Sequence, residues 1–251
     1  MTESFNRNLA ALRKGLTVVA PLVAPGTTVP RMGTSDQDLG VIATGLLRKA
    51  FIQASAVAII AESALPESGI PNARSMLEAL GELHYLAQAS DRLHEAQIAF
   101  AYALYELRGF TRKWGDTDDI KTIEREVEEK ERVTPQAYTE ARARNNYWIP
   151  IGRAQLVEDA FRWLLRSTDQ AESDAGRAVY KLLSWDEHHV MAALLSVEVN
   201  PAKPEFGQVK RQDAPDAPEE YVAMLAVGAL ASMLKLYTDI FPETIECLAG
   251  I

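Results

Sequence analysis

A single cysteine, Cys247, is present in the 251 residues, so an intrachain disulfide is excluded. One cysteine suits a reducing compartment, and we expect a cytoplasmic protein. The first residues show no basic segment followed by an apolar run, so we expect no secretory signal peptide. Long apolar runs are also scarce. The most apolar stretches, 50–61 and 222–234, fall short of the roughly 18–20 residues of a membrane span, and we expect core helices there.

An excess of positive charge is missing as well. The chain has 35 acidic and 26 basic residues and a net charge of −9. Broad binding to nucleic acid depends on neutralising phosphates, so this balance disfavours it without excluding a local basic groove. The sequence also lacks a Gly-x-Ser-x-Gly nucleophile motif, glycine-rich phosphate loops and the Cys/His spacing of a zinc site.

One stretch, 142–166, interleaves arginines with tyrosine and tryptophan, a pattern that can hold single-stranded nucleic acid. Glu158 and Asp159 within this stretch and Glu140 just before it make the local excess of positive charge small. We therefore interpret this stretch as a solvated face that carries a few core aromatics.

Strand signals are few, and apolar residues recur with helical spacing along most of the chain. The pattern predicts an all-α, single-domain bundle of about eight to ten helices over residues 1–251. The core bundle is expected over 36–240, with a helix at 2–19 packed on it and one short β-hairpin near 197–210. Pro21 is expected to end the first helix, and Ser90 to cap the helix over 91–114.

The helix expected over 118–132 differs from the others because its apolar stripe is thin. Only Ile120, Ile123 and Val127 form that stripe, and charged residues fill most other positions. We expect a solvated helix that protrudes from the body of the protein.

Five polar residues fall within stretches that otherwise have the pattern of buried helices: Arg74, Glu78, Tyr180, Ser184 and His188. Burying polar groups is costly unless they are paired, so these residues are the candidates for one shared ligand-binding site.

Each candidate also has a structural interpretation. Arg74 and Glu78 form either an intrahelical ion pair or a buried arginine that presents its planar group to an anion or a partner helix. Ser184 has the spacing of a helix cap, and Tyr180 suits a core position. His188 is expected near a helix N-terminus, where its cationic form is disfavoured, so a neutral imidazole could serve as a base. We favour a structural hydrogen bond for His188 over a chemical role.

Metal binding is a weaker interpretation. Asp91 and His94 are three residues apart, as are Asp186 and His189, and di-iron bundles use Glu-x-x-His pairs with further glutamates. Glu62, Glu78 and Glu82 could supply those carboxylates. Both pairs use aspartate in a first helical turn, where the helix dipole alone favours it, so we expect no metal and no cofactor.

Two segments together resemble a group of all-helical bacterial proteins of unknown function. One is 72–80 with the Arg-x-x-x-Glu pattern of Arg74 and Glu78, and the other is 180–188 with a Tyr-x-x-Leu-Ser-x-x-x-His pattern. The resemblance implies a helical bundle over about 36–240 and no particular reaction.

These patterns predict a binding, sensing or regulatory module whose partner is a small molecule or a protein, with a homodimer as the expected assembly. The alternative is a ribonuclease of the HEPN type, as found in toxins and phage defence, acting through Arg74 and His188 as catalytic residues. That family places histidine four to six residues after arginine, and the chain lacks that spacing, so the alternative is an analogy of fold.

Overall fold

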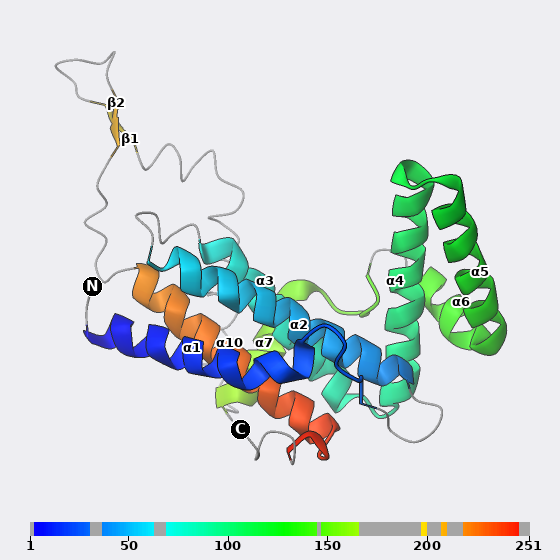
Figure 1. Cartoon of the computed structure of the whole chain (residues 1–251), viewed down its shortest axis with the longest axis horizontal. Helices are drawn as coiled ribbons and strands as arrows, with labels where there is room; N and C mark the ends of the chain where they lie inside the picture. The colour runs from blue at the N-terminus through cyan, green and yellow to red at the C-terminus, as the bar shows by residue number, and fades with distance from the viewer. Residues whose placement is uncertain are drawn as a thin grey trace.

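A computed structural model describes residues 3–30, 37–62, 69–144, 147–165, 197–199, 207–209 and 218–245. Within these ranges the chain is helical apart from one two-stranded hairpin, so the predicted all-α bundle is confirmed (Figure 1). The helices are α1 (Glu3–Val23), α2 (Gln37–Ile60), α3 (Ile70–Gln88), α4 (Arg92–Trp114), α5 (Thr117–Val133), α6 (Pro135–Ala143), α7 (Arg153–Leu165) and α10 (Pro218–Ile240). Strands β1 (Val197–Val199) and β2 (Gly207–Val209) pair antiparallel where the hairpin was expected, with Val197 opposite Val209.

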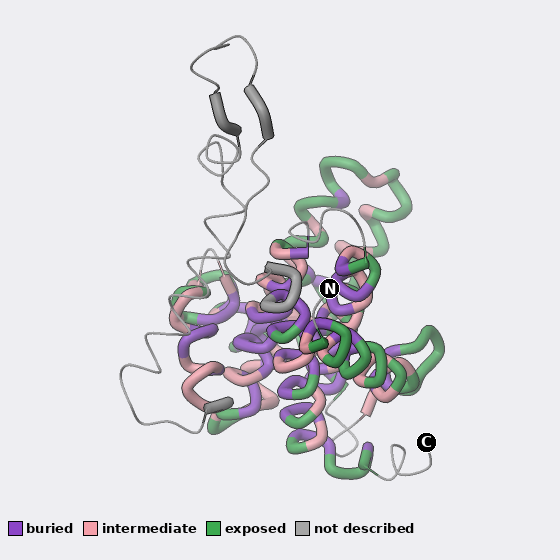
Figure 2. Tube along the Cα trace, turned by 90° about the vertical axis from the view of Figure 1, so that its left-hand side faces the viewer, coloured by how far each residue is buried: buried purple, intermediate pink, exposed green. Residues whose placement is uncertain are grey.

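The body of the protein consists of α1, α2, α3, α7 and α10, which pack around one large apolar core. Helix α3 lies at its centre and contacts α2, α7 and α10. Met76, Ala79, Leu80 and Leu83 of α3 are almost completely buried in this core. Figure 2 shows the buried positions gathered where these helices face one another. Because α3 is held on several sides by this packing, the polar residues that it carries have fixed positions.

Helices α4, α5 and α6 form a second unit, which we call the arm, and it stands away from the body in Figure 1. The arm has a small apolar cluster of its own, which includes Ile98, Leu104, Val127 and Tyr138. Val127 is the only residue of α5 that is buried. The expectation of a solvated, protruding helix is therefore confirmed.

Two expected helix ends differ from the structure. Helix α1 continues through Pro21 to Val23, because burial of Leu22 and Val23 outweighs the one hydrogen bond that proline removes in the last turn. Helix α4 is capped by Asp91 rather than Ser90, since a carboxylate oxygen of Asp91 accepts the backbone N–H of His94 at 2.9 Å.

Two helices are long and apolar enough to cross a membrane by length and composition, at Gln37–Ile60 and Val222–Ile240. The apolar runs expected to be too short thus lie within longer helices. Of their apolar windows, 33% and 56% respectively are buried in the bundle, and a core helix passes the same test.

Candidate functional site

Arg74 and Glu78 lie one turn apart on α3, as their spacing predicts. The Arg74 Nε donates to Oε1 of Glu78 at 3.2 Å, and each side chain is only 13% exposed. Glu78 also faces Arg153 at the start of α7, with Nη1 and Oε2 3.8 Å apart. The carboxylate of Glu78 thus joins cations from two helices at the contact between α3 and α7.

The other three predicted residues, Tyr180, Ser184 and His188, lie outside the described residues, as do Asp186 and His189. The structure therefore places only Arg74 and Glu78 of the predicted set.

The polar stripe of α3 continues one turn further, at Glu82. This glutamate is 8% exposed, and the hydroxyl of Tyr147 donates to its Oε1 at 2.5 Å. Burial and the negative charge of Glu82 raise the pKa of Tyr147, which keeps the phenol protonated as the donor. Lys49 of α2 lies 4.0 Å from the same oxygen, and Arg153 stacks 5.3 Å from the Tyr147 ring. These contacts hold the segment before α7 against α2 and α3.

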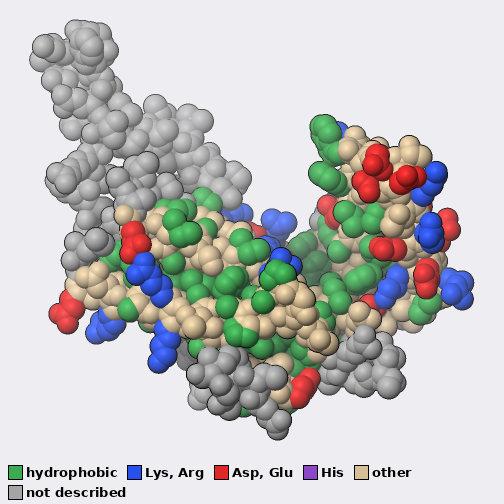
Figure 3. All heavy atoms as spheres, in the orientation of Figure 1, with side chains coloured by type: hydrophobic (Ala, Val, Ile, Leu, Met, Phe, Trp, Pro, Cys, Tyr) green, Lys and Arg blue, Asp and Glu red, His purple; other side chains and the backbone are tan. Residues whose placement is uncertain are grey.

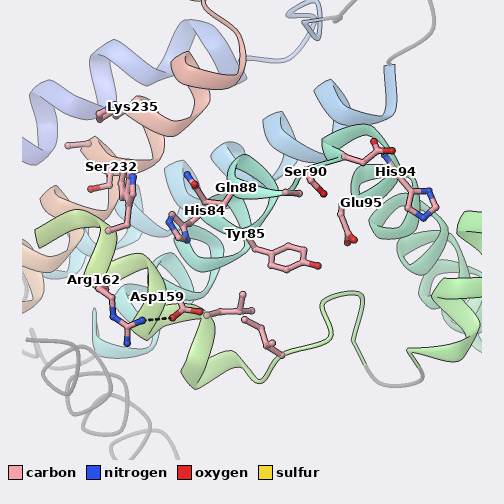
Figure 4. Close-up of a pocket in the computed structure, with 16 residues that line it drawn as sticks. His84, Tyr85, Gln88, Ser90, His94, Glu95, Asp159, Arg162, Ser232 and Lys235 are labelled. Atoms are coloured by element: carbon pink, nitrogen blue, oxygen red, sulfur yellow. Dashed lines mark hydrogen bonds and ion pairs between the residues drawn. The ribbon is translucent and has the colours of Figure 1, made fainter. Parts of the chain in front are cut away.

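A cavity of about 1200 Å³ adjoins this scaffold, between α3, the start of α4, α7 and α10. Figure 4 shows side chains from all four helices directed toward it. The tyrosine ring of Tyr85 lies between one end formed by α7 and α10 and another formed by the start of α4 (Figure 4). The volume of the cavity suits a small ligand. The segments that line the cavity are far apart in the sequence.

At the first end, His84 of α3 packs against Trp163 of α7 with ring centroids 5.5 Å apart. Burial lowers the pKa of His84, and the negative charge of Asp159 offsets only part of that effect. The imidazole is therefore neutral at pH 7 and offers one donor and one acceptor nitrogen. Ser232 of α10 also lines the cavity, and its hydroxyl donates to the carbonyl of Gly228 at 2.6 Å.

Charged groups at this end are ion-paired within the protein. Arg162 of α7 contacts Glu158 at 3.2 Å and Asp159 at 3.5 Å. Lys235 of α10 binds Asp239 at 2.7 Å, and its Nζ lies 5.8 Å from the ring centre of Trp163. The charges of opposite sign largely cancel where the ring of Trp163 meets the cavity.

The charged groups at the second end of the cavity, near the start of α4, are also ion-paired within the protein. The carboxylate of Glu95 receives two hydrogen bonds from Arg144, at 2.8 and 3.1 Å, and Arg144 also donates to the carbonyl of Trp148 at 2.6 Å. His94 lies 3.1 Å from Glu140 of α6. Burial, and then the charge of Glu95, raise the pKa of Tyr85, so its hydroxyl stays protonated beside these groups.

Asp91 and His94, whose spacing was considered for metal binding, form a helix cap, because the Asp91 carboxylate accepts the backbone N–H of His94. In the described part of the chain, no three histidine, cysteine, aspartate or glutamate residues are grouped so as to hold a metal ion.

The sequence did not identify the cavity, although Asp91 and His94, considered there as a metal pair, are among the residues that line it. Trp163 and Arg162 belong to the stretch interpreted as a solvated face with a few core aromatics. Trp163 does pack on the core, but the sequence did not indicate that both residues line a cavity. The available signal was the pair His84 and Gln88, polar residues four apart near the end of an apolar helix. Their partners on α7 and α10 follow only from the tertiary fold.

Comparison of the chain with protein-family models, with curated proteins and with solved structures gives no match. The interpretation of the site consequently depends on its own geometry.

Proposed function

We propose that the protein is a small-molecule-binding module whose ligand occupies the cavity between α3, α4, α7 and α10. The observation that carries this proposal is the composition of the cavity wall. Aromatic rings from Tyr85 and Trp163 lie next to hydrogen-bonding groups from His84 and Ser232, in a space of about 1200 Å³. Binding sites typically combine mostly apolar walls with a few well-placed polar groups, and this cavity has both.

The electrostatics of the wall favour a ligand without net charge. The cations Arg162 and Lys235 and the anion Glu95 each have an ion-pair partner in the protein. A charged ligand would have to compete with those pairs, whereas a neutral ring system can lie against Trp163 and exchange hydrogen bonds with neutral His84. We therefore expect a neutral heteroaromatic compound with both donors and acceptors.

The test is a thermal-shift screen that compares neutral nucleosides with the corresponding monophosphates, followed by NMR titration of the indole N–H signals. We expect neutral compounds to raise the melting temperature and to shift the Trp163 signal. His84→Ala should weaken binding at least tenfold, because one hydrogen-bonding group and part of the ring contact are lost.

Trp114 provides the matched control, since it lies at the far end of α4 and is 68% exposed. Trp114→Phe should bind as the unmodified protein does, whereas Trp163→Phe should bind more weakly. If no neutral compound shifts the Trp163 signal, or if both tryptophan variants bind equally, the cavity is not the ligand site.

A further inference from the structure

Large apolar side chains are exposed along the outer half of α4, on the arm. Leu107, Phe110 and Trp114 are 43%, 63% and 68% exposed. Together with exposed Ala103 they recur at intervals of four, three and four residues, and we call these four residues the α4 stripe. Figure 3 shows hydrophobic side chains along the edge of the arm that faces the body, with charged side chains gathered over α5 on the other side. Contiguous apolar patches that are exposed on a protein surface usually mark an interaction site.

The stripe is not the face by which α4 packs into the arm. That packing uses Leu104 and Thr111, which are 6% exposed, and the side of α4 on which Arg108 and Arg112 bind Glu124 of α5. The stripe lies on the remaining side of the same helix. Its spacing is that of the alternating core positions of a helix pair, so a second helix can pack along it.

The charges beside the stripe identify that second helix. Glu106 and Lys113 are both exposed, and they flank the stripe seven residues apart at the same position of the repeat. In an antiparallel helix pair these flanking positions face their own equivalents, so Glu106 of each copy meets Lys113 of the other. A parallel pair would place Glu106 opposite Thr111, which is buried within the arm.

We propose that the α4 stripe is a self-association surface, which pairs antiparallel with the α4 stripe of a second copy of this chain. A two-fold axis near Phe110 brings Leu107 of one copy against Phe110 of the other and forms the Glu106–Lys113 ion pair twice. Such an isologous contact closes on itself and gives a dimer. It spans about three helical turns per copy, so the dimer dissociates on dilution. This surface is separate from the cavity, and its test is independent of ligand binding.

Charge reversal in the full-length protein, followed by sedimentation velocity over a concentration series, tests the proposal. Glu106→Lys and Lys113→Glu each place like charges together at two points, and we expect each to raise the dimer dissociation constant roughly tenfold. The double variant with both substitutions restores opposite charges and should recover the original constant. Phe110→Glu should leave only monomer.

The control is Lys121→Glu, because the Lys121 side chain lies on α5, is 68% exposed and has its Nζ 3.7 Å from Asp118 on the same helix. It should leave the dissociation constant unchanged. The proposal is overturned if the unmodified chain is monomeric up to about 100 µM, or if the double variant fails to recover the constant of the unmodified protein. It is likewise overturned if a monomeric chain sediments with vesicles of phosphatidylcholine and phosphatidylserine through Phe110 and Trp114, because the stripe then contacts lipid.

Discussion

The body and the arm are both helical, but different interactions hold them together. The body has a continuous apolar core in which Leu12, Leu47, Leu83 and Met233 are completely buried. The arm has a small cluster and relies on ion pairs that cross between its helices, such as Arg108 with Glu124 and Arg142 with Glu131. Exposed ion pairs contribute little stability, whereas buried apolar area contributes most of it. The arm is therefore the less stable part, and its surface is available for contacts.

The largest effect is expected from removing a side chain at the centre of the body. Leu83→Ala leaves a cavity where the leucine has no solvent exposure, and should lower the free energy of unfolding by about 2–5 kcal/mol in a urea titration. Leu104→Ala, in the arm cluster, should lower the free energy of global unfolding less, because the arm can open locally. Equal losses for the two variants would mean that the arm and body unfold as one unit.

A smaller effect is expected from Tyr147→Phe, which removes the donor to buried Glu82 and leaves that carboxylate partly unsatisfied. We expect a loss of about 1–3 kcal/mol, measured by the same titration. Tyr138→Phe in the arm is the matched control. The Tyr138 hydroxyl is buried, and no hydrogen bond to it is found in the described part of the chain, so its removal should change stability by less than about 0.5 kcal/mol.

Replacing glycine by alanine at two open helical positions should increase stability. An added Cβ at Gly45 of α2 or Gly109 of α4 meets no described atom within 4 Å, so alanine there should stabilise its helix by about 0.5–1 kcal/mol. We expect Gly45→Ala to raise the global unfolding energy and Gly109→Ala to raise hydrogen-exchange protection mainly in the arm. Gly81→Ala is the contrasting variant, because its Cβ would lie 3.0 Å from the backbone of Leu156 on α7. That variant should lose stability.

The smallest change in the stability of the whole protein is expected from acidification, which should act mainly on the arm. Hydrogen bonds from Arg108, then Arg112, lower the pKa of Glu124 in the folded arm. Because this pKa is lower in the folded arm than in the unfolded chain, the ionised carboxylate stabilises the folded arm at any pH above the unfolded pKa of about 4.3. The stabilisation is lost as the pH falls from there through the pKa of the folded state. Protection factors in α5 should therefore fall between pH 7 and pH about 3 before those of α3 do. Glu124→Gln should show a weaker pH dependence, and an unchanged protection of α5 would contradict this account.

The sequence predicted most helices because their signals are local. The apolar spacing of α5 predicted its exposure, and the four-residue spacing of Arg74 and Glu78 predicted their contact. The cavity was not predictable in this way, since His84 and Trp163 meet only after α3 and α7 pack together. The end of α1 could not be predicted for the same reason. The helix continues past Pro21 because Val23 is buried against helices that are distant in sequence.

Helix α4 is continuous from the cavity to the stripe. Glu95, in its first turn, lines the cavity, and Trp114 ends it at the tip of the arm. A helix of 23 residues is about 34 Å long, so it acts as a lever in which a tilt of one degree at the cavity moves the tip by about 0.6 Å. In the dimer that we propose, the two α4 stripes are held together, so a ligand that changes the angle of α4 at its base would change how the two bodies lie relative to each other.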